Sequence, residues 1–251
     1  MILAPGAAIA ALALVVAGAP SGTGRERPLA SLSASPTRIA LSGSSRASIT
    51  LTNYGATLAQ VSVGRGSFTL DLRGRPAIGR PGARSAQSWL TFRPSALSIA
   101  PGGKAELDVA ARVPARARPG DHHALLLLVT RPSRVGGVGV RMRLGVRVAV
   151  RAPGRVVRRV AVRGLRVRRT GGRVRGLDVT LENLGDLIET KVVDVVLSAR
   201  GRLDRVHAET REVLPRTRAI LTARYVGQLR GRVTARVEVD GVARRSFRLR
   251  L

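Results

Sequence analysis

Apolar and polar residues alternate along most of this chain, in short segments separated by Gly, Pro and Asn. In segment 47–52, Ile49 and Leu51 share one face and three hydroxyl side chains share the other. Comparable segments follow at 58–63, 89–92, 105–111 and 124–129, and one precedes at 37–41. About seven short strands at this spacing predict an antiparallel β-sandwich. Gly64–Ser88 interrupts the pattern and predicts a long mobile loop with a short strand near Phe68.

A strongly alternating segment, 141–151, closes this first module. Met142, Leu144, Val146, Val148 and Val150 share one face, and Arg141, Arg143, Arg147 and Arg151 share the other. Residues 152–154 (Ala-Pro-Gly) then predict a linker. The predicted fold is therefore all-β, with two tandem immunoglobulin-like antiparallel β-sandwiches at 33–151 and 155–251.

The second module continues with segments at 160–167, 177–181, 190–197, 217–225 and 230–239. The apolar parity changes at Gly164, which predicts a β-bulge. In the last hairpin, alternate residues of 231–239 and of 247–251 should face the core. Core-facing residues of the two strands pair with one another only if the loop has three residues, with Gly241 at positive φ. Asn53 and Asn183 each begin an Asn-x-Gly turn after the second strand of a module. This repeat fits two related folds, and equally fits ordinary turn chemistry.

The N-terminus is apolar and uncharged over Ile2–Ala17 and continues into Ala17-Gly18-Ala19. This length and the small-x-small pattern predict a signal peptide at 1–19, followed by an N-terminal tail at 20–32. An Ala-rich buried helix is the alternative, and a true start upstream of Met1 is another. We therefore expect a secreted protein, at the cell surface or associated with the cell wall, with no membrane span in the mature chain.

The chain is strongly basic: 44 Lys and Arg against 15 Asp and Glu give a net charge of +29. Residues 122–177 contain 15 Arg and no acidic residue. Guanidinium groups suit phosphate and carboxylate, so we expect a polyanion-binding surface there. Solvated strand faces in an Arg-biased composition are the alternative explanation. The candidate binding residues are Arg141, Arg143, Arg147, Arg151, Arg155, Arg158, Arg159, Arg163, Arg166, Arg168 and Arg169.

Catalytic and cofactor chemistry find little support in the sequence. Cysteine is absent, and the adjacent His122 and His123 would point to opposite faces of a strand, as surface histidines near a turn. His207 is isolated, and no serine lies in a Gly-x-Ser-x-Gly motif. The glycines at 136–139 lack the strand–loop–helix context of a phosphate loop and predict a hairpin turn. We expect a non-enzyme with no metal and no cofactor.

The order of features in the first module resembles a known family. Its features follow one another as in the peptidoglycan-binding, immunoglobulin-like domain of WxL-interacting proteins. They are, in chain order, Ser35-Pro36, Ile49 to Asn53, Phe92-Arg93-Pro94, Ile99 to Gly103 and Arg118 to His122. The resemblance covers about residues 33–150. That family usually ends in a transmembrane helix, whereas this chain stops at Leu251. The same order of features is also similar to periplasmic pilus chaperones.

Three functions follow as hypotheses. The first is an exported, non-catalytic scaffold of the cell envelope that binds peptidoglycan or an anionic wall glycopolymer, together with a surface protein. The second is a periplasmic, pilus-chaperone-like assembly factor that acts by strand addition. The third is a cytosolic polyanion or nucleic-acid binder. The basic segment lacks aromatic residues for base stacking, which disfavours nucleic acid.

Overall fold

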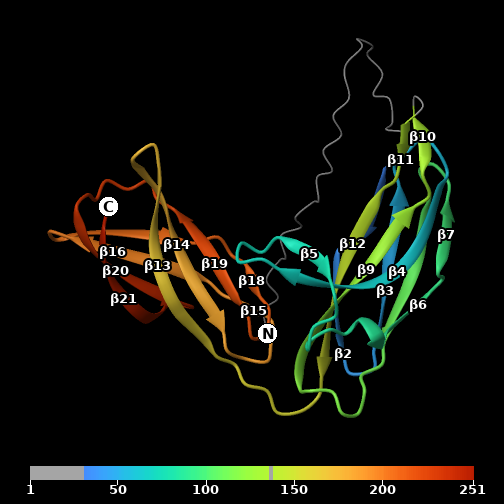
Figure 1. The fold of residues 1–251 in the computed structure, drawn as a ribbon, viewed down its shortest axis with the longest axis horizontal. Coiled ribbons are helices and arrows are strands. Elements are labelled where there is room, and N and C mark those ends of the chain that lie inside the picture. Colours follow the sequence, from blue (N-terminus) through green and yellow to red (C-terminus); the bar gives the residue numbers. More distant parts are fainter. Residues whose placement is uncertain (1–30, 136–137) are drawn as a thin grey trace, which may run out of the picture.

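The computed structural model describes residues 31–135 and 138–251 and consists of two β-sandwiches (Figure 1). In the described ranges, the single helical element is the short 3-10 turn η1 (Gln87–Trp89). The predicted fold class, two tandem immunoglobulin-like antiparallel sandwiches, is confirmed. The predicted signal peptide at 1–19, and the predicted tail as far as residue 30, lie outside the described residues.

The first sandwich consists of two main sheets. One has the order β1 (Leu32–Ser35), β3 (Arg46–Asn53), β8 (Lys104–Ala111), β6 (Leu90–Arg93). The other has the order β2 (Arg38–Ser42), β12 (Arg143–Ala152), β9 (Gly120–Thr130), β4 (Ala59–Leu70), β5 (Pro76–Gly79), and β7 (Ala96–Ile99) also pairs with β4. A small hairpin, β10 (Ser133–Val135) and β11 (Val138–Val140), connects β9 to β12. Fully buried aliphatic side chains such as Ile49, Leu107 and Leu126 fill the space between the sheets.

The segment 64–88 is more ordered than its composition suggests. β4 continues through Gly64 and Gly66 to Leu70, and β5 pairs with its end. A Cβ on Gly66 would lie 3.1 Å from Cδ1 of Leu127 on β9, so the glycine makes room for that side chain. The prediction of a long mobile loop is therefore wrong, because these glycines serve close packing within a strand.

The second sandwich also has two main sheets. β13 (Val160–Thr170), β14 (Arg173–Asn183) and β19 (Arg218–Arg224) form one, and β17 (Arg202–His207), β16 (Val193–Ala199), β20 (Arg232–Val239) and β21 (Val242–Arg250) form the other. A small pair, β15 (Glu189–Thr190) and β18 (Glu212–Val213), faces the first sandwich (Figure 1). The register between β13 and β14 shifts between Val162 and Gly164, which confirms the predicted bulge.

In the last hairpin, the expected core-facing residues pair with one another, but the loop that connects the two strands differs from the prediction. Val239 pairs with Val242, so the loop has two residues, Asp240 and Gly241, both at positive φ. A register shift after Val237 inserts one extra residue on β21, and Val233 then faces Leu249. The predicted three-residue loop is wrong, because a bulge inside the strand corrects the parity instead.

The two Asn-x-Gly turns have the same geometry. Asn53 Nδ2 donates to Thr57 O (2.8 Å) and Ile99 O (2.9 Å), and its Oδ1 accepts the Gly55 N–H (2.9 Å). In the second sandwich, Asn183 Nδ2 donates to Leu187 O (2.7 Å) and Val213 O (2.9 Å), and its Oδ1 accepts the Gly185 N–H (2.8 Å). The same three bonds at the same place in each sandwich support a common fold for the two halves.

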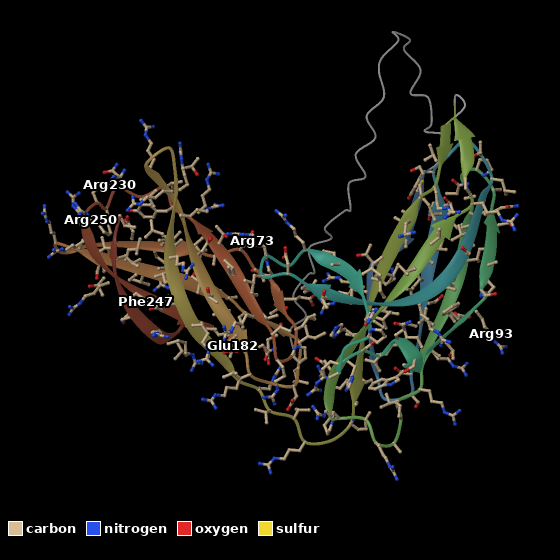
Figure 2. All side chains as sticks on the ribbon, in the orientation of Figure 1. Arg73, Arg93, Glu182, Arg230, Phe247 and Arg250 are labelled. Atoms are coloured by element: carbon tan, nitrogen blue, oxygen red, sulfur yellow. The ribbon has the colours of Figure 1, made fainter. Side chains whose placement is uncertain are left out.

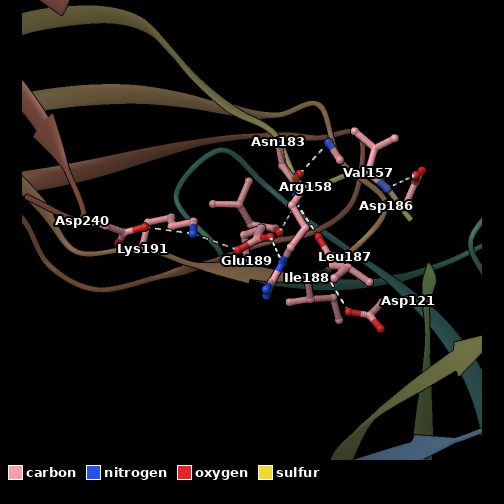
Figure 3. Close-up of polar contacts among 12 residues, drawn as sticks. Asp121, Val157, Arg158, Asn183, Asp186, Leu187, Ile188, Glu189, Lys191 and Asp240 are labelled. Carbon is pink, nitrogen blue, oxygen red and sulfur yellow. Dashed lines mark hydrogen bonds and ion pairs between the residues drawn. The ribbon is translucent and has the colours of Figure 1, made fainter. Parts of the chain in front are cut away.

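A shared interface joins the two sandwiches. Phe68 and Leu125 of the first form a small apolar cluster with Leu214 of the second. Asp121 is 4% exposed, and its carboxylate accepts two bonds from Arg151 (2.7 and 3.0 Å) and one from the Ile188 N–H (2.8 Å). The last of these contacts crosses between the sandwiches (Figure 3).

Asp186 makes the reciprocal set of contacts from the second sandwich. Its carboxylate binds Arg84 (2.7 Å) and Arg216 (3.0 Å) and accepts the Val157 N–H (3.0 Å). The Val157 hydrogen bond, followed by that from Arg216, lowers the pKa of Asp186 below its ordinary value. The angle between the sandwiches is therefore set by buried polar contacts as well as by packing.

His122 and His123 are not the surface residues that the sequence predicts. His122 is 3% exposed, its ring lies 4.3 Å from that of Trp89, and its Nε2 donates to Arg118 O (2.8 Å). His123 lies on the opposite face of β9 against Phe68. Burial lowers the pKa of both histidines below 6.5. The expected surface position is wrong because β9 is the central strand of its sheet.

These histidines predict a loss of stability in mild acid. The folded state keeps them neutral, so the unfolded state binds more protons once the pH falls below 6.5. We expect the melting temperature to fall by a few degrees between pH 7.5 and pH 5.5, measured by circular dichroism. A His122→Gln variant should show a flatter profile in this range. An identical slope in the variant and the parent would show that His122 does not contribute.

Candidate functional site

The backbone of β12 has a free edge on the side of β2. β12 pairs with β9 over its full length, Arg143 to Ala152, but with β2 only over 147–151. The Arg147 N–H donates to Thr37 O, and Arg151 O accepts the Gly43 N–H, so odd-numbered residues direct their polar backbone groups toward β2. Arg143 and Gly145 have the same parity and lie beyond the end of β2. Such an edge can accept another strand.

An apolar row accompanies this free edge. Met142 and Leu144 are half-buried against the core, and Val140 beside them is 38% exposed. A groove of about 230 Å³ opens at this end of the sandwich, with Leu32, Leu58 and Met142 among its lining residues. Within the residues that the structure describes, the free edge therefore combines unpaired backbone groups with apolar side chains that are only partly covered.

Two arginines lie where β2 covers this edge. Arg38 and Arg147 are direct partners in the parallel pair of β2 and β12. Both form ion pairs with Glu212 on β18 of the second sandwich, Arg147 at 2.7 Å. The two guanidinium side chains are 44% and 40% exposed, whereas the Glu212 side chain is 14% exposed. This cluster carries two positive charges and one negative charge at the junction of the sandwiches.

The structure divides the eleven predicted polyanion-binding arginines into two sets. Four of them form ion pairs: Arg147 with Glu212, Arg151 with Asp121, Arg158 with Glu189, and Arg163 with Glu182 (Figure 3 shows the Arg158 pair). Arg141 and Arg143 are exposed beside the free edge, Arg155 and Arg159 lie between β12 and β13, and Arg166, Arg168 and Arg169 are exposed on β13. The predicted stretch is thus spread over both sandwiches, and its binding of a polyanion stays a prediction.

In the part of the chain that the structure describes, no three His, Asp or Glu side chains are grouped closely enough to hold a metal ion. None of the described helical segments has the length and apolar character needed to span a bilayer.

Comparison with known proteins gives structural likeness alone. No family model and no curated protein matches the chain. Among solved structures, the YadV chaperone is 12% identical, with 88% of this chain and 99% of that chain covered and a TM-score of 0.47. The CupB2 chaperone of Pseudomonas aeruginosa is 15% identical (87% and 99% covered, TM-score 0.44). The Salmonella enterica SafA pilin–SafB chaperone complex is 14% identical (88% and 96% covered, TM-score 0.46).

These findings correct the leading functional expectation. The structures named above are described as chaperones, one of them in complex with a pilin, and a further match is a chaperone in complex with a tip adhesin. A scaffold that binds peptidoglycan or a wall glycopolymer is therefore the wrong interpretation, and the comparisons give no support to the expected cell-wall association. The resemblance to WxL-interacting proteins stays a prediction from the sequence.

Proposed function

We propose that this chain is an exported, non-catalytic assembly chaperone that lends the free edge of β12 to an incomplete sheet of another protein. The observation that carries the proposal is the edge itself. Arg143 and Gly145 direct their backbone groups past the end of β2, beside the half-buried Met142 and Leu144. Strand addition needs both features, since main-chain bonds give affinity and alternate side chains give specificity.

The surroundings of the edge support a partner strand of apolar character. Met142 and Leu144 both pack against the core, so a strand paired with this edge would meet apolar side chains at alternate positions. The groove beside Leu32 and Leu58 offers room for one of its side chains. Past the end of the edge, Arg38 and Arg147 face the junction, where a carboxylate of the partner would compete with Glu212.

Pilins and adhesins are the first partner class to test. A tagged form of the chain should be co-expressed in a bacterial periplasm with a pilin-like subunit encoded in the same genome, and the complex should be isolated by the tag. Hydrogen exchange then measures how fast the backbone N–H groups of the free edge exchange with solvent in the chain alone and in the complex. We expect one-to-one capture and at least tenfold slower exchange at Arg143 and Gly145, because their N–H groups become hydrogen-bonded.

A matched pair of variants tests the position of the contact. Leu144→Asp places a charge in the apolar row of β12, and Leu97→Asp places one on edge strand β7. Both side chains are half-buried against the same core. We expect Leu144→Asp alone to abolish capture while both variants melt cooperatively at similar temperatures. Equal capture by the two variants, or unchanged exchange at Arg143 and Gly145 in the complex, would contradict strand addition at this edge.

A further inference from the structure

The far end of the second sandwich carries a basic groove that the strand-addition edge does not use. This distal groove has a volume of about 1170 Å³ and lies across β16, β17, β20 and β21. Five exposed arginines line it: Arg200, Arg202, Arg232, Arg248 and Arg250. Among the described residues that line it, none is acidic or aromatic. Figure 2 shows Arg250 at the end of this sandwich that lies away from the first one.

The positive charges in the distal groove are close together. Arg232 and Arg250 are direct cross-strand partners on β20 and β21. Like charges in that position repel one another and weaken a sheet. Arg248 is two residues from Arg250 on the same face, about 7 Å away along the strand. In addition, Arg169 at the tip of β13 donates to Arg250 O (2.6 Å), which brings another guanidinium to the rim.

The same sheet neutralises its arginines elsewhere. Arg236 shares the outer face of β20 with Arg232, and it binds Glu238 at 3.0 Å. Arg205 on β17 binds Glu238 at 2.7 Å and Asp194 at 3.2 Å. By contrast, none of the five groove arginines forms an ion pair with a carboxylate in the described part of the chain. A uniform Arg bias does not explain this difference between two ends of one sheet.

We propose that the distal groove is a docking surface for anionic phospholipid headgroups at a membrane surface. Guanidinium groups bind phosphate through paired N–H donors, and the groove arranges several of them on one open face. Leu203 lies among them and is 71% exposed, which suits the boundary between headgroups and acyl chains. The lack of aromatic lining residues disfavours a nucleic acid, which would need them for base stacking.

Vesicle co-sedimentation tests this docking surface. The full chain should pellet with vesicles of phosphatidylcholine and phosphatidylglycerol, but not with phosphatidylcholine alone, and high salt should release it. The triple variant Arg232→Gln, Arg248→Gln, Arg250→Gln should bind the anionic vesicles about tenfold more weakly or worse, because each basic residue near the surface adds to the attraction. A thermal melt should show that the variant folds, since the change relieves repulsion.

A charge-matched control separates the groove from net charge. Arg80→Gln, Arg112→Gln, Arg116→Gln removes three exposed arginines from the first sandwich and should leave vesicle binding within about twofold of the parent. Equal weakening by the two triple variants, or no binding by the parent, would overturn the proposal. Stronger binding of duplex DNA than of vesicles, lost in the groove variant, would also overturn it. The Leu144→Asp variant should bind vesicles normally, so this outcome is independent of strand addition.

Discussion

Asp121→Ala should lower the free energy of unfolding by about 2 kcal/mol, because it leaves the Ile188 N–H at the junction without an acceptor and removes the charged partner of Arg151. The carboxylate is 4% exposed and accepts bonds from Arg151 Nε, Arg151 Nη2 and the Ile188 N–H. Arg151 stays charged in the variant, because a guanidinium does not lose its proton in proteins, but its side chain is half exposed and water can replace the lost partner. Since the Ile188 bond crosses to the second sandwich, we also expect the two sandwiches to unfold less cooperatively.

Urea unfolding followed by circular dichroism measures the loss, and calorimetry shows whether one transition becomes two. Asp108→Ala is the control. Asp108 is an exposed aspartate on β8 of the first sandwich, and its removal should change stability by less than about 0.5 kcal/mol. A loss below about 1 kcal/mol for Asp121→Ala, with a single sharp transition, would show that the junction does not depend on this carboxylate.

Local alternation was sufficient to predict most strands. The apolar face from Met142 to Val150 becomes the inward face of β12, and the parity change at Gly164 becomes a bulge. These features depend on side chains a few residues apart, so a period of two reveals them. The free edge of β12 could not be predicted in the same way. It exists because β2 pairs with residues 147–151 alone. The local pattern of apolar residues in β12 does not reveal which of its residues a strand distant in the sequence will pair with.

The sequence alone also could not predict which arginines are neutralised in the folded protein. The sequence presents residues 122–177 as one acid-free basic stretch, but Arg147 binds Glu212 and Arg151 binds Asp121, partners 65 and 30 residues away. The fold thus neutralises arginines near the junction of the sandwiches. It leaves exposed a set at the far end, Arg232, Arg248 and Arg250, that lies outside the stretch. The net charge predicts attraction to polyanions, and the fold determines which surface remains positively charged.

Asn183→Ala should lower the free energy of unfolding by about 3 kcal/mol, and Asn53→Ala by a similar amount. Each side chain is almost completely buried and makes three bonds to backbone groups. Alanine leaves those groups without partners, and each such loss costs about 1–3 kcal/mol before the turn relaxes. In the second sandwich, one lost bond joins the turn to Val213 on β18, so the face that contacts the first sandwich should also loosen.

Asn183→Asp sharpens this prediction. It keeps the oxygen that accepts the Gly185 N–H but replaces the Nδ2 donor with an oxygen facing Leu187 O and Val213 O. We therefore expect it to be at least as destabilising as alanine at neutral pH, measured by urea unfolding, and to recover partly in acid when the carboxyl group can donate one bond. Milder loss in the aspartate variant than in the alanine variant at neutral pH would mean that the Gly185 bond, and not the two bonds across the turn, holds this part of the sandwich together.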